Sequence, residues 1–143
     1  MSKTVIVYWS GTGNTEMMAK EIQEGAAKAD ADVKLFEVTE TSAQDVSQYS
    51  NLILGCPAMG AEVLEEGDFE PFFTDLEKNL AGKKVALFGS YGWGDGEWMR
   101  NWAERVTNAG AEMVNDEGLI ANGEPDDDVL AQCRELGEKV AAL

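Results

Sequence analysis

The chain has 143 residues, of which 44% are apolar and 27% charged, which is the size and composition of a single globular domain over residues 1–143. Its 27 acidic and 11 basic side chains leave a net charge of −16, which disfavours nucleic acid and anionic membranes as partners and favours basic protein surfaces. The chain contains no histidine, which excludes Ser-His-Asp and Cys-His catalysis and His-ligated zinc. The apolar run of residues 5–9 is too short to span a membrane, so a soluble cytoplasmic protein is expected.

In chain order, short apolar runs alternate with longer segments that have the period of a helix. The first half predicts a strand over residues 4–9, a helix over 14–29, strands over 33–38 and 51–56, and a helix over 69–80. The second half predicts a strand over residues 85–89 and helices over 97–109 and 127–142. A fifth strand is expected in two pieces, 113–114 and 119–120, because polar residues separate them.

Strands that alternate with helices of this length indicate βαβ units, and therefore a parallel sheet covered by helices on both faces. In such sheets ligands bind at the carboxyl ends of the strands, near the point where the strand order reverses. Functional residues are therefore expected in the loops that follow strands, at residues 10–15, 57–68, 90–96 and 122–128.

The loop after the first strand predicts a phosphate site. It consists of small and polar residues, Ser10, Gly11, Thr12, Gly13, Asn14 and Thr15. It opens directly into a helix, so backbone N–H groups, side-chain donors and the positive end of the helix dipole converge there. No lysine follows, and Glu16 stands where the dinucleotide fingerprint has its third glycine, so a triphosphate or a dinucleotide is disfavoured. One terminal phosphate held by neutral donors is preferred, and a helix cap without a ligand is the alternative.

Two further loops carry side chains suited to a flat ligand. Trp93 lies between glycines on a polar loop, which favours stacking on a ligand over packing in a core. Met59 is polarizable and suits the other face of an aromatic ring. Trp98 and Trp102 share one face of a helix and are expected in the core, whereas Trp9 is compatible with covering the ligand or with core packing.

The two cysteines, Cys56 and Cys133, match no metal-binding spacing. They are interpreted as buried small hydrophobes in a reducing compartment, although a disulfide between them is compatible with the sequence.

The loop segments 10–15, 56–60 and 90–96 closely resemble, in sequence and in order, those of the short-chain flavodoxins of anaerobic bacteria. The resemblance covers essentially the whole chain. It implies a three-layer α/β fold, flavodoxin-like, with a five-stranded parallel sheet in the order 2-1-3-4-5 and helices on both faces. Long-chain members of the family carry a large insertion in strand 5, whereas a few polar residues interrupt it here.

The resemblance also implies FMN as the cofactor, with its phosphate held by residues 10–15. Met59 and Trp93 would flank the isoalloxazine ring, and Glu62 would accept a hydrogen bond from the ring N3–H. The peptide that joins Gly60 to Ala61 would respond to the change at flavin N5 on reduction. The cofactor-binding residues that the resemblance implies in the second and third loops are Pro57, Ala58, Met59, Gly60, Ala61, Glu62, Ser90, Tyr91, Gly92, Trp93 and Gly94.

Acidic residues gather in the same loops, at Glu62, Glu65, Glu66, Asp68, Glu70, Asp95, Glu97, Asp126, Asp127 and Asp128. The simplest interpretation is a solvated acidic face. In an electron carrier this charge would also oppose an anionic hydroquinone and steer the flavin edge toward basic partners. We therefore expect a low-potential one-electron carrier with non-covalent FMN, cycling between semiquinone and hydroquinone, and not an enzyme.

By the same resemblance, the partners would be ferredoxin-using oxidoreductases, among them 2-oxoacid oxidoreductases, and ferredoxin–NAD(P) reductases, with the chain acting as a monomer. The alternative is an FMN-dependent NAD(P)H:quinone reductase on the same fold, which needs room for a nicotinamide that Trp93 and Met59 would cover. A response-regulator-like signalling domain is disfavoured, because the third strand ends in Gly55 and Cys56 and not in a phosphorylatable Asp.

Overall fold

The computed structural model describes residues 3–60, 62–115 and 117–143. Its strands are β1 (Thr4–Tyr8), β2 (Lys34–Glu37), β3 (Asn51–Gly55), β4 (Lys84–Tyr91), β5 (Glu112–Met113) and β6 (Leu119–Asn122). Its helices are α1 (Asn14–Ala29), α2 (Ala43–Val46), α3 (Phe69–Glu77), α4 (Glu97–Asn108) and α5 (Asp127–Ala141). The predicted elements are confirmed in type and order, although α3 ends before residue 80 and β4 continues beyond residue 89. Within the described residues no helix is both long and apolar enough to cross a membrane.

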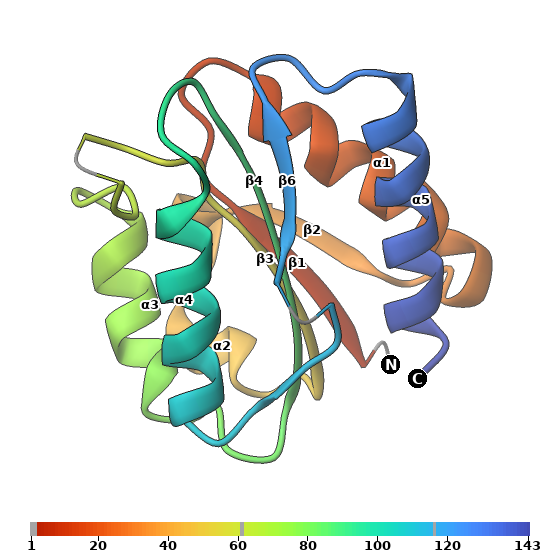
Figure 1. Ribbon diagram of the computed structural model, residues 1–143. Helices are drawn as coiled ribbons and strands as arrows, with labels where there is room; N and C mark the ends of the chain where they lie inside the picture. The colour runs from red at the N-terminus through yellow and green to blue at the C-terminus, as the bar shows by residue number, and fades with distance from the viewer. Residues whose placement is uncertain (1–2, 61, 116) are drawn as a thin grey trace.

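The strands form one parallel sheet in the order β2-β1-β3-β4-β5, with β6 also paired to β4, which confirms the predicted order. Figure 1 shows α1 and α5 on one face of the sheet and α2, α3 and α4 on the other. The predicted three layers are therefore confirmed. The strand order reverses beside β1, so the carboxyl ends of β1, β3 and β4 form the edge where a ligand is expected.

The apolar runs of the strands are buried on both sides of the sheet. Val5 and Val7 belong to the core cluster that contains the apolar side chains of α3 and α4. Ile6 lies between them in sequence and belongs to the opposite cluster, with the apolar side chains of α1 and α5. Successive side chains of a strand point to opposite faces, so a parallel sheet with two covered faces needs a continuous apolar run.

The fifth strand is split, as the sequence predicts. β5 pairs with the start of β4 and β6 with its end. In the gap, the backbone N–H of Leu87 donates to Asn115 Oδ1 at 3.1 Å, and Asn115 Nδ2 donates to the Leu87 carbonyl at 2.9 Å. The side chain of Asn115 thus replaces the missing backbone partner, because a buried peptide group without a partner is costly.

Two short elements between β2 and β3 were not expected from the sequence. A 3-10 turn, η1 (Val38–Glu40), begins at Glu37, whose side chain and that of Glu40 form a reciprocal capping box. The one-turn helix α2 begins after Ser42, whose Oγ accepts a hydrogen bond from the backbone N–H of Asp45 at 3.1 Å. Elements this short carry too little periodicity to be recognised, although both capping patterns are visible in the sequence.

Candidate functional site

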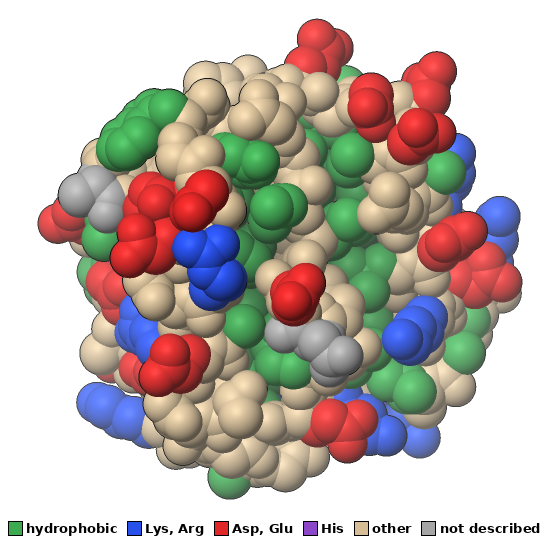
Figure 2. Space-filling model, in the orientation of Figure 1, with side chains coloured by type: hydrophobic (Ala, Val, Ile, Leu, Met, Phe, Trp, Pro, Cys, Tyr) green, Lys and Arg blue, Asp and Glu red, His purple; other side chains and the backbone are tan. Residues whose placement is uncertain are grey.

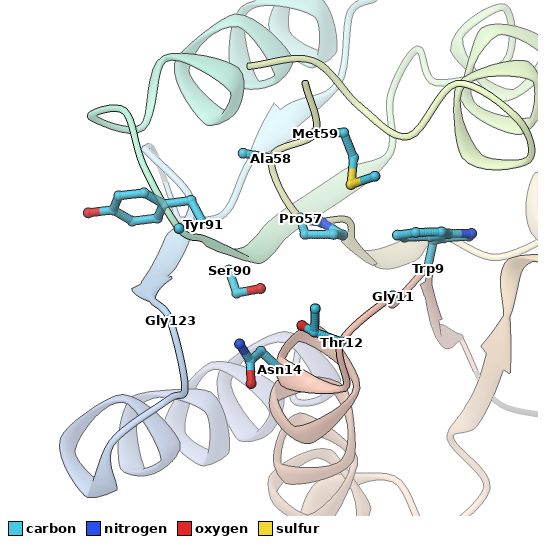
Figure 3. Close-up of a pocket in the computed structure, with 11 residues that line it drawn as sticks. Trp9, Gly11, Thr12, Asn14, Pro57, Ala58, Met59, Ser90, Tyr91 and Gly123 are labelled. Carbon is cyan, nitrogen blue, oxygen red and sulfur yellow. The ribbon is translucent and has the colours of Figure 1, made fainter. Parts of the chain in front are cut away.

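An open cavity of about 230 Å³ lies at the carboxyl ends of β1, β3 and β4 (Figure 3). Its lining comes from four segments: Trp9, Gly11, Thr12, Asn14, Pro57, Ala58, Met59, Ser90, Tyr91, Gly92 and Gly123. Figure 3 shows Thr12 and Asn14 at one end of the cavity, Trp9 and Met59 on one side and Tyr91 on the opposite side. The three loops singled out from the sequence therefore converge on one space.

The start of α1 has the geometry of an anion site. Gly13 is the residue before the helix, with φ of 98°, a left-handed conformation that favours glycine, and it has no side chain with which to cap the helix. Ser10 Oγ accepts hydrogen bonds from the backbone N–H groups of Gly13 at 3.1 Å and Glu16 at 3.3 Å, which ties the loop to the first turn. The N–H groups of Asn14 and Thr15 have no partner among the described residues, so they remain available to an anion at the helix N-terminus.

Thr15 connects this loop to the end of β4. Its side chain is buried, and its hydroxyl lies 3.1 Å from the Ser90 hydroxyl and 3.4 Å from the Ser90 backbone nitrogen. The Ser90 carbonyl in turn accepts a hydrogen bond from the Ala58 backbone N–H at 3.0 Å. The three loops are thus held in register by direct hydrogen bonds, and the Thr15 hydroxyl is already engaged within the protein.

Aromatic and thioether side chains form the walls of the cavity. Trp9 is half-buried and packs against the backbone of Gly11, where a Cβ atom would lie 3.0 Å from the indole ring. Met59 and Tyr91 are half-buried on the other two loops. Trp93 is 67% exposed and lies outside the lining. Stacking of Trp93 on a ring therefore stays a prediction. Trp9, for which the sequence allowed either ligand contact or core packing, lines the cavity.

Trp98 and Trp102 lie in the core with 1% of their surface exposed, as predicted. Trp98 Nε1 donates to the carbonyl of Cys56 at 3.0 Å, which ties α4 to the end of β3.

Cys56 and Cys133 are buried and unpaired with each other, which confirms their interpretation as small core residues. Burial raises the pKa of both thiols, that of Cys133 to about 12, so both stay protonated at neutral pH.

The loop after β3 places Glu62 in an unusual position. Gly60 has φ of 49°, and Glu62, with φ of 56°, is the one non-glycine residue with a positive φ in the described part of the chain. Glu62 Oε1 is buried without a hydrogen-bond partner among the described residues. Its carboxyl group lies so close to Gly94 that a Cβ atom there would overlap it. The predicted Gly60–Ala61 peptide lies outside the described residues, because Ala61 is not among them.

The cavity collects most of the predicted residues but not all of them. Those outside its lining are Ser10, Gly13, Thr15, Gly60, Glu62, Trp93 and Gly94. Ser10, Gly13 and Thr15 make hydrogen bonds that hold the loop of residues 10–15 in place, and Gly94 lies against Glu62. Gly123 also lines the cavity and was not among the predicted residues, although it lies in the fourth strand-end loop, residues 122–128.

Acidic side chains surround this edge of the sheet. Figure 2 shows Asp and Glu side chains along the upper edge of the molecule, above the start of α5. The exposed acids of the strand-end loops are Glu66, Asp68, Asp95, Glu97, Glu124, Asp126, Asp127 and Asp128. Arg100 is bound to Asp95, with its guanidinium 3.0 Å from both the carboxylate and the carbonyl. These exposed acids form an acidic rim, so the predicted acidic face is confirmed for them. Glu62, Glu65 and Glu70 are half-buried and do not belong to it, and Glu70 is bound to Arg105.

Comparison with known proteins identifies the family. The family model described as Flavodoxin matches residues 6–137. The flavodoxin of Megasphaera elsdenii is 52% identical over 136 residues, 95% of this chain and 96% of the relative, and that of Clostridium beijerinckii is 49% identical over 138 residues, 96% of this chain and 99% of the relative. The solution structure of two-electron reduced Megasphaera elsdenii flavodoxin superposes with a TM-score of 0.88 at 50% identity, covering 98% of this chain and 99% of that one. The chain therefore belongs to the flavodoxin family, whose members carry electrons on FMN and are not enzymes.

Proposed function

We propose that residues 1–143 form one FMN-binding unit that carries single electrons at low potential, working between the half-reduced and fully reduced cofactor. The observation that carries this proposal is the start of α1, where the N–H groups of Asn14 and Thr15 have no partner among the described residues and adjoin an apolar cavity. A phosphate suits the helix N-terminus, and a flat ring suits the walls of Trp9, Met59 and Tyr91. A flavin mononucleotide combines both chemistries in one molecule.

The size of the cavity fits a partly enclosed cofactor. Its volume of about 230 Å³ is below the roughly 300–1,000 Å³ of sites that enclose a small molecule. A flavin held there would keep one edge exposed. An exposed edge suits outer-sphere electron transfer to another protein, whereas an enzyme needs space for a second substrate beside the ring.

The donor set also fits FMN. The phosphate would be held by Ser10, Gly11, Thr12, Gly13, Asn14 and Thr15, with amide N–H groups and hydroxyls and without a cation. The ring would contact the loops formed by Pro57, Ala58, Met59, Gly60, Ala61 and Glu62, and by Ser90, Tyr91, Gly92, Trp93 and Gly94. The buried, unpartnered Glu62 Oε1 suits the N3–H donor of a flavin ring. FMN supplies the redox chemistry, and the protein supplies binding, access and the electrostatic field.

The acidic rim supports the proposed potential and partners. Fixed negative charge beside the ring opposes the addition of negative charge, so it lowers the potential for the second electron. The same charge attracts basic docking surfaces at a rate that falls with added salt. We propose as partners ferredoxin-using oxidoreductases, including 2-oxoacid oxidoreductases, and ferredoxin–NAD(P) reductases, with the chain acting as a cytoplasmic monomer.

Stepwise reduction of the purified protein with FMN tests the proposal. We expect a yellow protein that passes through the blue, neutral one-electron reduced flavin before it is bleached. Incubation with NADH or NADPH and a quinone serves as the enzymatic control and should give no steady turnover. A protein that takes up no FMN, or one that oxidises the nicotinamide continuously, would overturn the proposal.

A further inference from the structure

A second cavity, of about 100 Å³, lies between the loop that carries Glu62 and helix α4. Its lining includes Glu62, Leu64, Trp98, Asn101, Trp102 and Arg105. It is distinct from the larger cavity at the strand ends, with which it shares no lining residue.

Two buried polar atoms without a partner belong to residues that line this cavity. They are Glu62 Oε1, an acceptor, and Trp102 Nε1, a donor, and no other buried side-chain N or O atom of the described residues lacks a partner. The Trp102 ring cannot turn its N–H to solvent, because it makes edge-on contacts with Phe69 at 5.4 Å and Phe73 at 5.8 Å between ring centroids. One cavity is therefore lined by a residue with an unpartnered donor and a residue with an unpartnered acceptor.

The neighbouring polar groups do not satisfy these atoms. Arg105 is the cation of the cavity, but its guanidinium donates to Glu70 at 2.8 and 2.9 Å and to Glu77 twice at 3.1 Å. These bonds use most of the guanidinium donors and raise the pKa of Arg105 further, so its guanidinium stays bound to the two glutamates of α3. The other indole N–H, on Trp98, already donates to the Cys56 carbonyl.

We propose that this cavity binds ordered water that connects the Trp102 indole N–H to the Glu62 carboxylate. A water molecule occupies about 30 Å³ in the liquid, so the cavity has room for it. Water can accept from the indole and donate to the carboxylate at once, and the exposed Asn101 at the cavity wall provides a third polar partner. An anion is disfavoured by Glu62 and Glu70, which both line the cavity. A cation is disfavoured because both Glu70 oxygens already accept from Arg105, which leaves Glu62 as the one carboxylate of the described lining not bound to Arg105.

The bound water makes Trp102 a positioning residue for Glu62. Glu62 has a left-handed backbone, which persists in proteins when the surroundings hold it. Gly94 confines the carboxyl group on one side, and the water would hold it on the other. A carboxylate has lone pairs for several donors, so Glu62 can keep this water and still accept from a ligand. The effect on FMN rests on the proposed function, whereas the water site does not.

NMR contacts between indole protons and water test the site directly, on the protein with and without FMN. The Trp102 indole proton should show cross-relaxation with a long-lived water. The Trp98 indole proton, bound to a carbonyl, serves as the internal control and should show none. Glu62→Ala should abolish the Trp102 signal. A wild-type Trp102 indole proton without a water contact would overturn the proposal, whether or not FMN binds.

Trp102→Phe tests the positioning role, because it removes the N–H and keeps an aromatic ring. FMN affinity should fall about fivefold, the loss expected for one hydrogen bond. Phe73→Leu, which loosens the packing of the same indole but keeps its N–H, is the matched control and should change FMN affinity less than twofold. In a Glu62→Ala background Trp102→Phe should cause no further loss. An equal loss in both backgrounds, or an equal effect of Phe73→Leu, would refute the positioning role.

Discussion

Ser10→Ala should separate the binding of FMN from that of riboflavin, which lacks the phosphate. The Ser10 hydroxyl accepts hydrogen bonds from the N–H groups of Gly13 and Glu16 at 3.1 and 3.3 Å, so it closes the loop before α1. Each such bond contributes about 1 kcal/mol net, so in the alanine variant the ordered conformation of the loop is less stable by about 2 kcal/mol. If the phosphate must restore that order, FMN affinity falls roughly 30-fold, since about 1.4 kcal/mol is tenfold. Riboflavin affinity should stay within about twofold.

Titration of the FMN-free protein with both flavins, followed by quenching of flavin fluorescence, gives the ratio of the two affinities. Ser42→Ala is the matched control, because Ser42 makes the same kind of capping bond, at 3.1 Å, to the start of α2. It should lower the free energy of unfolding slightly and leave the ratio unchanged. The loop of residues 10–15 contains no lysine, so FMN affinity should hold or rise with added salt. Equal losses for FMN and riboflavin in Ser10→Ala would refute the phosphate assignment.

Three further predictions concern the loops after β3 and β4 and the contact between α3 and α4. Trp93→Ala should weaken FMN binding and ease formation of the fully reduced cofactor, because it removes an electron-rich ring and admits water; an unchanged second potential would show that Trp93 does not stack. Gly60→Val should lower the first reduction potential by some tens of millivolts with FMN still bound. A β-branched residue at a φ of 49° is strained by about 1–2 kcal/mol, and for one electron about 1.4 kcal/mol corresponds to about 59 mV. Gly82→Val, the same change at a φ of 82° far from the cavity, should leave that potential unmoved. The Arg105 hydrogen bonds hold the pKa of Glu70 below its ordinary value of 4.5, so this carboxylate stabilises the fold above that pH and less so as the pH falls through its folded pKa. Glu70→Gln should therefore lower the free energy of unfolding at neutral pH and make it fall less as the pH becomes acidic. Urea unfolding of the variant and the parent at neutral and acidic pH measures this. The same pH dependence in both proteins would show that the Glu70–Arg105 pair does not stabilise the fold.

Much of this protein could be predicted from local pattern. A continuous apolar run such as Val5–Ile6–Val7 indicates a strand buried on both faces, and alternation with helices then implies parallel order. The predicted phosphate loop, residues 10–15, is equally local, because its glycines, its polar side chains and the helix start are consecutive in the chain. The split of the fifth strand was visible as a polar interruption near Asn115.

Other features were decided only by the tertiary structure. The Asn115 amide takes the place of a strand at Leu87, and Thr15 meets Ser90 across 75 positions of sequence. The sequence context of Trp9 fits a core position equally well. Only the packing of its ring against Gly11 assigns it to the cavity wall. The two unpartnered atoms, Glu62 Oε1 and Trp102 Nε1, lie on different elements, and neither residue type predicts the presence of the other. Periodicity and turn chemistry report the conformation of neighbouring residues, whereas these contacts depend on the distances that packing sets between segments remote in the chain.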